Sequence, residues 1–244
     1  MSGHSHWATI KRAKAGNDAK RGKVWSKIAR KIITAARAGG GDPAANLTLR
    51  YTVEEGRQAN MPRDTIEKAI LKGTGELGAE NYEVASYEGY GPGGVAIMIE
   101  ALTNNRARTA PELRRIFEVA GGNLGQNGSV SFQFNKQGMI TIKSDATTED
   151  KLIEIALDAG ADDVRNEGEA FVVITNPTAM LKVREAIAGK GIAIEASEVS
   201  FQPTTTVALD AHMAGRILRL VDALEDNEDV QKVAHNGEIP DDVT

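Results

Sequence analysis

The residues with the clearest chemistry are basic, and they gather near the start of the chain. Residues 1–37 contain ten Lys and Arg side chains and one acid, Asp18. Such a segment can bind polyanions, because each phosphate that a cation neutralises releases a condensed counterion. A solvated basic surface is the alternative interpretation. The candidate contacts are His4, Trp7, Lys11, Arg12, Lys14, Lys20, Arg21, Lys23, Lys27, Arg30, Lys31 and Arg37.

Two further features could contact nucleic acid. Trp7 could stack on a base, or it could hold the basic segment against the helices that follow, which we favour. The loop 103–109 (TNNRART) carries Asn105, Arg106 and Arg108, and guanidinium groups bind phosphate as planar forks. Turn chemistry, with Thr109 capping a helix, explains this loop equally well. The glycine-rich loop 121–129 allows the same two interpretations.

No pattern typical of catalysis or of cofactor binding occurs in the sequence. The run GYGPGG at 89–94 matches a dinucleotide-binding pattern, but a predicted strand follows it where a helix is needed, which favours a hairpin turn. The four histidines form no H-E-x-x-H motif. The absence of cysteine excludes disulfides and thiolate chemistry. We therefore expect a non-enzyme with no metal, no cofactor and no small-molecule substrate.

Charge divides the chain into two parts. Residues 1–72 carry 15 basic and 6 acidic side chains, whereas the remaining 172 residues carry 14 and 28. An acidic body repels polyanions, so we expect nucleic acid to contact the front of the chain. Hydrophobic residues make up 41% and charged residues 26%, which is typical of a globular protein. No window approaches the length of a transmembrane helix, and no signal peptide is evident, so we expect no membrane partner.

Helices are needed to position the basic residues. The spacing of Trp25, Ile28 and Ile32 predicts a helix over 23–38 with one apolar face and a cationic face opposite. Asp42-Pro43 predicts the N-cap of a second helix that continues to about residue 59. Asn60-Met61-Pro62 predicts the start of a third, ending at Gly73. These three helices would form a small bundle.

After residue 83, predicted strands alternate with helices. Strands are expected at 84–90, 95–102, 130–134, 139–143, 164–166, 171–175, 192–201 and 230–233, and helices at 109–120, 149–159, 177–188 and 210–224. The order within 139–200 is β-α-β-β-α-β, the ferredoxin-like order. The predicted fold class is α+β with several domains: an N-terminal three-helix domain, then two ferredoxin-like α/β domains, the second inserted into the first. The expected boundaries are 1–78, 79–135 together with 202–244, and 136–201.

Several of these segments together resemble the YebC/PmpR family. They are MSGHSHWATIKRAK, DAKRGKVWSKIARKI, the N-M-P-x-D-x-I-x-x-A-I stretch at 60–70, YEGYGPGG, TNNRART and GGNLGQNGSVSFQF. The resemblance extends from residue 2 to about residue 240. It implies a helical N-terminal domain followed by two α/β domains, one inserted in the other. It also implies that His4, Trp7, Lys11, Lys14, Lys20, Arg21 and Lys23 form a basic signature, and that Asn105, Arg106, Arg108 and Thr109 form an Asn/Arg loop. His6 and Arg12 depart from the residues that the family often has there.

The resemblance implies a function in gene expression. Family members are described as probable DNA-binding transcriptional regulators, while others act on translation at the ribosome, including at stretches of prolines, and the mitochondrial relatives are translational activators. The leading interpretation is a non-enzymatic nucleic-acid-binding regulator of transcription. The alternative is a ribosome-associated translation factor that binds ribosomal RNA. The signature begins at residue 2, with no transit peptide before it, so we expect a bacterial-type cytoplasmic protein.

Overall fold

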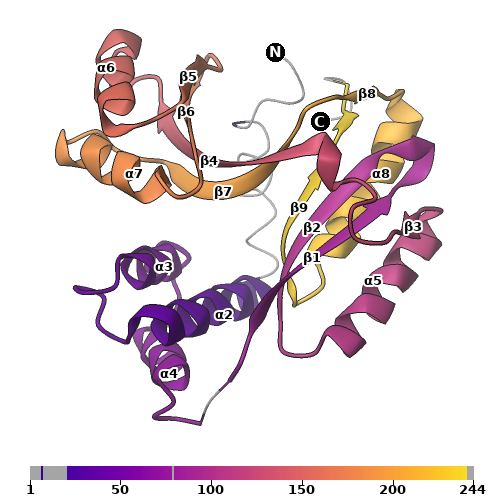
Figure 1. The fold of residues 1–244 in the computed structure, drawn as a ribbon, viewed down its shortest axis with the longest axis horizontal. Helices are drawn as coiled ribbons and strands as arrows, with labels where there is room; N and C mark the ends of the chain where they lie inside the picture. Colours follow the sequence, from indigo (N-terminus) through magenta and orange to yellow (C-terminus); the bar gives the residue numbers. More distant parts are fainter. Residues whose placement is uncertain (1–6, 8–20, 79, 241–244) are drawn as a thin grey trace. The chain divides into compact units, whose positions relative to one another are not determined.

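The computed structural model describes residue 7, residues 21–78 and residues 80–240 (Figure 1). The chain separates into two units. One, here called the bundle unit, comprises Gly16–Ser129 and Arg216–Val233. The other, the central unit, comprises Val130–Gly215 with Met1–Ala15 and Ala234–Thr244.

Three helices open the bundle unit, as the sequence predicts. They are α2 (Arg21–Gly39), α3 (Leu47–Gln58) and α4 (Arg63–Thr74). The apolar stripe of α2 is buried against the other two helices, with Ile32 and Leu49 fully enclosed. The predicted start of the second helix is wrong, because Asn46 and not Asp42 forms the N-cap. The Asn46 side chain accepts a hydrogen bond from the Leu49 amide and donates to the Ala35 carbonyl, so it caps α3 and ties it to α2.

The same unit contains a four-stranded sheet in the order β3-β1-β2-β9. Its elements are β1 (Glu83–Tyr90), β2 (Ala96–Thr103), α5 (Arg106–Ala120), β3 (Asn123–Leu124), α8 (Ala211–Glu225) and β9 (Val230–His235), of which α8 and β9 cross the division between the units. Strands β1 and β2 form an antiparallel hairpin around Pro92–Gly94, so the glycine-rich run is the predicted turn. If β1 came after β3 in the sequence, the connectivity and the strand order would be those of a ferredoxin-like fold. The sheet is therefore ferredoxin-like, with one strand in a different place in the sequence.

Both α5 and α8 pack on one face of this sheet. A Cβ at Gly89 would lie 2.8 Å from the Phe117 ring of α5, and a Cβ at Gly91 would lie 2.8 Å from Ile217 of α8. Gly89 faces Ile97 across the hairpin, and Ile97 is fully buried. The missing side chain at Gly89 therefore lets α5 approach the sheet closely.

The central unit contains the second ferredoxin-like sheet. Its elements are β4 (Phe134–Lys143), α6 (Glu149–Ala159), β5 (Asp163–Asn166), β6 (Ala170–Thr175), α7 (Met180–Gly189) and β7 (Ala196–Pro203), and the antiparallel sheet has the order β5-β6-β4-β7. Helices α6 and α7 pack on it through Leu152, Ala156, Val183 and Ile187. Strands β8 (Val207–Ala208) and β10 (Gly237–Glu238) pair in parallel.

One strand prediction in this unit is wrong. Residues 130–133 form no strand: Ser131–Gln133 is a short 3-10 helix, and β4 runs without interruption from Phe134 to Lys143. The polar residues at 135–137 separate two apolar runs and suggest a break, but they pair with β7, so the strand continues. The short strands β3, β8 and β10 were not expected at all.

The α+β class with several antiparallel sheets is confirmed, and seven α-helices lie in the described part of the chain. The three predicted domain boundaries stay a prediction. No described helix has the length and apolar character needed to cross a membrane.

Candidate nucleic-acid interface

Helix α2 places its basic residues on one side because of its period. Ile28, Ile32 and Ile33 are buried in the bundle, so Lys23, Lys27, Arg30 and Lys31 face away from that core. The sequence predicts that this side presents its charges to solvent. The structure brings acidic groups of the same chain to it.

Three lysines of this side have partners within the bundle unit. Lys23 Nζ lies 3.5 Å from Asp226 Oδ2, and both side chains are exposed by more than two fifths. Lys27 Nζ donates to the Glu225 carbonyl oxygen at 2.6 Å, and Lys31 forms an ion pair with Glu55 at 2.7 Å. Ion pairs at such exposure contribute little to stability, so these lysines can exchange partners at small cost.

Arg30 differs from the lysines because it is nearly enclosed. Its side chain is 11% exposed, so the expectation of a solvent-facing cation is wrong for this residue. Its guanidinium lies 3.2 Å from the Glu228 carboxylate and 3.1 Å from Asp229 Oδ1. It also donates to the Glu228 carbonyl and lies 5.4 Å from the centre of the Tyr82 ring. Arg30 therefore joins α2 to the segment between α8 and β9.

Asp229 is the centre of this arrangement, with only 2% of its surface exposed. Arg108 Nη2 donates to both carboxylate oxygens, at 2.9 and 2.7 Å, and Thr109 Oγ1 donates to Oδ2 at 2.6 Å. The Asp229 carbonyl accepts from the Leu102 amide of β2. We call Arg30, Arg108, Thr109 and Asp229 the Asp229 cluster.

Electrostatics in the cluster favour the ionised carboxylate. Burial opposes ionisation of Asp229, but the hydrogen bonds from Thr109 and Arg108 and the charges of Arg30 and Arg108 outweigh it, so the pKa of Asp229 lies below its ordinary value. A carboxylate thus occupies the position between two guanidinium groups where a phosphate would otherwise fit.

The Asn/Arg loop is held by the same cluster. Asn105 caps α5 by accepting from the Arg108 amide at 3.1 Å, so the predicted cap at Thr109 is wrong. Thr109 is instead fully buried, with its hydroxyl 2.8 Å from that of Thr103. Arg106 is exposed and pairs with Glu83 at 2.8 Å. The loop brings Arg108 into contact with Asp229, while Arg106 points to the end of β1.

The remaining predicted residues are Lys23 and Arg37 of α2 and the residues of the N-terminal segment. Lys23 and Arg37 are exposed on α2. His4, Lys11, Arg12, Lys14 and Lys20, and the side chain of Arg21, lie outside the described residues. The Trp7 amide donates to Glu167 and its indole N–H to Glu169 at 2.8 Å, so Trp7 contacts the β5–β6 turn within the central unit. Contact of any of these residues with nucleic acid stays a prediction.

The glycine-rich loop 121–129 folds against β1. The Gly125 amide donates to the Glu88 carbonyl, and the Gly128 amide to the Glu88 carboxylate at 2.8 Å. Tyr90 donates its hydroxyl to the Ser129 carbonyl. These bonds satisfy a buried carboxylate and give the loop a structural role.

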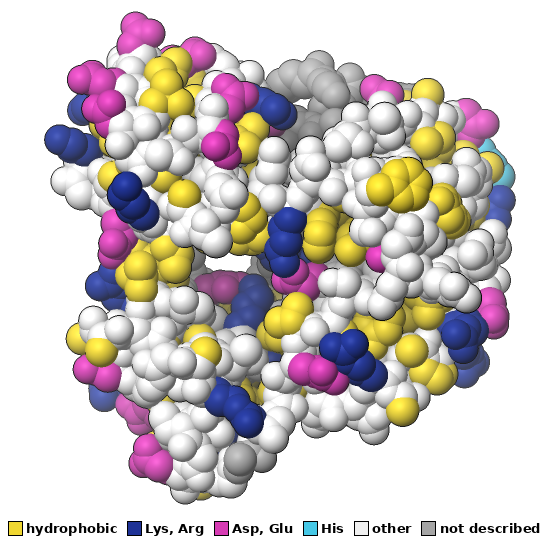
Figure 2. All heavy atoms as spheres, in the orientation of Figure 1, with side chains coloured by type: hydrophobic (Ala, Val, Ile, Leu, Met, Phe, Trp, Pro, Cys, Tyr) yellow, Lys and Arg dark blue, Asp and Glu magenta, His cyan; other side chains and the backbone are white. Residues whose placement is uncertain are grey.

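The described surface shows no broad basic patch on the face drawn in Figure 2, where Lys and Arg side chains lie interspersed with Asp and Glu.

Sequence reasoning missed the acidic partners of α2. The run Glu225-Asp226-Asn227-Glu228-Asp229 was visible in the sequence, but an acidic run after a helix is usually a solvated turn. Among the described residues, no group of three or more His, Asp or Glu side chains is placed to hold a metal ion.

Two family models match the chain. The model described as "TACO1/YebC protein N-terminal domain" matches residues 5–76, and the model described as "TACO1/YebC second and third domain" matches residues 82–237. Together they cover the bundle helices and both ferredoxin-like sheets.

Full-length relatives show the same similarity. A "Probable transcriptional regulatory protein" from Treponema denticola is 51% identical over 241 residues, which cover 99% of this chain and 98% of the relative. One of the same name from Pelotomaculum thermopropionicum is 51% identical over 243 residues, covering 99% of this chain and all of the relative. The crystal structure of a conserved hypothetical protein from Aquifex aeolicus is 44% identical with a TM-score of 0.85, covering 97% of this chain and 98% of that one.

Proposed function

Because the chain belongs to the TACO1/YebC family, we propose that it is a non-enzymatic, nucleic-acid-binding regulator of transcription that binds DNA in the cytoplasm. The observation that carries this proposal is the similarity over the whole chain to proteins called probable transcriptional regulatory proteins. The concentration of positive charge in residues 1–37 supports it from the sequence.

Within this proposal the basic residues divide into two roles. Lys11, Arg12, Lys14, Lys20 and Arg21 contact phosphates, together with the exposed Lys23 and Arg37. Arg30 and Arg108 are positioning residues, because both are committed to the buried Asp229 carboxylate. They fix α2 relative to β2 and α5.

The salt dependence of DNA binding tests this division. If about six phosphates are contacted, affinity for a duplex DNA should fall roughly a thousandfold between about 50 and 200 mM salt. The triple variant Lys11→Gln, Arg12→Gln, Lys14→Gln should lower the slope of log K against log salt by about 2.7. The matched control removes three exposed lysines of the central unit, Lys151, Lys182 and Lys190, and should leave the slope unchanged. Equal slopes for both triple variants would contradict the proposal.

Ribosomal RNA is the second candidate target, and one observation disfavours the reading of bases in a DNA groove. Helix α4 follows α3 after a short turn at 59–62, as the second helix of a DNA-reading pair would, but its exposed first turns carry Asp64 and Glu67. Carboxylates there are poorly suited to a DNA groove. Binding to promoter DNA and co-sedimentation with ribosomes, compared at the same salt concentration, separate the two targets. Tighter binding to ribosomes would replace transcription with translation as the regulated step.

A further inference from the structure

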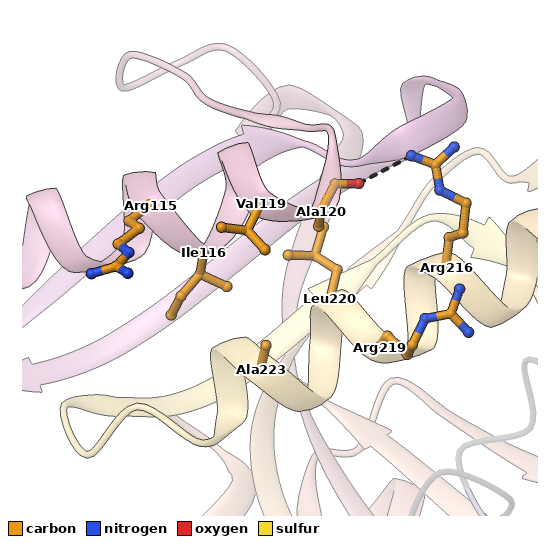
Figure 3. Close-up of a pocket in the computed structure, with 8 residues that line it drawn as sticks. All are labelled: Arg115, Ile116, Val119, Ala120, Arg216, Arg219, Leu220 and Ala223. Carbon is orange, nitrogen blue, oxygen red and sulfur yellow. Dashed lines mark hydrogen bonds between the residues drawn. The ribbon is translucent and has the colours of Figure 1, made fainter.

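A groove of about 460 Å³ lies between α5 and α8 in the bundle unit (Figure 3). Figure 3 shows Ile116 and Val119 projecting from α5 on the side of Leu220 and Ala223 of α8. The floor is closed by the core below, where Phe117 and Ile217 are fully buried. The groove is thus a depression over solid packing, flanked by two helices of similar length.

One apolar residue of the groove, Val119, is unusually exposed. The Val119 side chain is 83% exposed, although it lies on a helix that otherwise buries Leu113 and Phe117. Ile116 is half-buried, and the small side chains Ala120 and Ala223 leave the space between the helices open. Exposed apolar surface in a hollow with a polar rim is typical of an interaction site.

The rim is entirely basic. Arg115 on α5 and Arg216 and Arg219 on α8 line the groove, and no acidic residue does. Arg216 is fixed by a hydrogen bond of 3.1 Å to the Ala120 carbonyl. The acids of these two helices, among them Glu118 and Asp222, lie outside the lining. This lining is opposite in sign to the part of the chain that contains it, since residues 73–244 carry 28 acidic and 14 basic side chains.

We propose that the groove between α5 and α8 binds an acidic amphipathic helix of a partner protein. The apolar stripe of that helix would cover Ile116, Val119 and Ala223, and carboxylates on its two flanks would pair with Arg115 on one rim and with Arg216 and Arg219 on the other. Guanidinium groups suit this role because they bind carboxylates as bidentate forks. A nucleic acid would use the arginines but would leave the apolar floor without a partner, so the floor favours a protein.

Fluorescence anisotropy of a labelled synthetic helix tests the proposal on the full-length protein. The probe has Leu at positions i, i+3, i+4 and i+7, flanked by Glu, and a second probe has the Glu residues replaced by Lys. The double variant Arg115→Glu, Arg219→Glu should bind the acidic probe at least about tenfold more weakly. Arg114 and Lys182 are exposed and do not line the groove, so Arg114→Glu, Lys182→Glu is the control with the same charge change. It should bind as the parent does.

The place at which the probe binds can be checked with a site-specific label, because the chain has no cysteine of its own. A single Glu118→Cys variant carries one fluorophore beside the groove, and the acidic probe should change its emission in a saturable way. Saturable binding that only the arginine pair of the groove weakens supports the proposal. Equal binding of both probes, or equal effects of the two double variants, would overturn it.

Two other occupants give distinct results. If duplex DNA binding, and not probe binding, is lost in the Arg115→Glu, Arg219→Glu variant, the groove contacts phosphate and the proposal is wrong. If the protein alone self-associates in sedimentation velocity and this variant abolishes the association, the occupant is a second copy of the chain, which also overturns it. Self-association has no bearing on the DNA binding proposed for residues 11–37, whereas loss of DNA binding would add the groove to that interface.

Discussion

Neutralising Asp229 should destabilise the bundle unit far more than neutralising the neighbouring Asp226. In Asp229→Asn, one carboxylate oxygen becomes an NH2 group, yet an arginine donor faces each oxygen: Arg30 and Arg108 at Oδ1, and Arg108 at Oδ2. Removing one partner of a buried ion pair costs about 3 to 5 kcal/mol. The Arg108 side chain is 44% exposed, and water screens its charge, so we expect the lower end, about 3 kcal/mol.

Asp226→Asn is the matched control. The Lys23–Asp226 pair spans 3.5 Å with side chains 46% and 41% exposed, so its loss should cost less than about 1 kcal/mol. For a unit of this size, about 3 kcal/mol corresponds to a drop in Tm of roughly 6 to 12 °C.

Tryptophan fluorescence can report this unit alone. The chain has two tryptophans, and Trp25 donates its indole N–H to the Ala59 carbonyl within the bundle, so a Trp7→Phe background leaves Trp25 as the sole reporter. Thermal unfolding followed at Trp25 should give the large shift for Asp229→Asn and a small one for Asp226→Asn. Shifts within about 2 °C of each other would refute the idea that the buried cluster holds α2 to the rest of the unit.

Three further outcomes follow from the same contacts. The pKa of Asp229 is lower in the folded than in the unfolded protein, so ionised Asp229 contributes its full stabilisation above the unfolded pKa of about 3.9. That stabilisation is lost as the pH falls through the folded pKa. The difference in Tm between the parent and Asp229→Asn should therefore be constant from about pH 5 to 8 and shrink below about pH 4. Gly89→Ala should lower Tm because its Cβ would lie 2.8 Å from Phe117, whereas Gly22→Ala, with nothing within 4 Å on a helix, should not. Asn46→Ala should cost about 1 to 2 kcal/mol in urea unfolding, because the cap of α3 and the bond to the Ala35 carbonyl are both lost; an unchanged midpoint would contradict the capping role.

Local sequence signals were sufficient for most elements of the fold. The spacing of Ile28 and Ile32 predicts α2, and Gly121 and Gly160, which directly follow the predicted helices 109–120 and 149–159, have the left-handed conformation typical of a helix C-cap. The errors fall where two local signals compete. Asp42-Pro43 and Asn46 are both good helix starts, and Asn46 caps α3 because its amide also reaches the end of α2, which is a tertiary contact.

The arrangement around Asp229 could not be predicted from the sequence. Arg30 and Glu228 are 198 positions apart, and nothing in either local pattern identifies the other. A basic helix face and an acidic turn each have the composition of solvated surface, and only the permuted order of the first sheet, which brings β9 beside β2, places them together. The charge division of the chain is therefore partly neutralised within the bundle unit, where Lys23, Arg30 and Lys31 of α2 pair with acidic side chains.

The Asp229 cluster also decides whether Arg30 and Arg108 can bind phosphate. A phosphate would have to displace a carboxylate that two guanidinium groups and a hydroxyl already hold, with 2% of its surface exposed. We therefore expect Asp229→Asn, studied well below its Tm, to bind DNA with the salt slope of the parent. If the two arginines are phosphate ligands that the carboxylate covers, their release should instead steepen the slope by about 1.8 and tighten binding at low salt. That result would show that the carboxylate masks a phosphate site and would contradict a purely positioning role for both arginines.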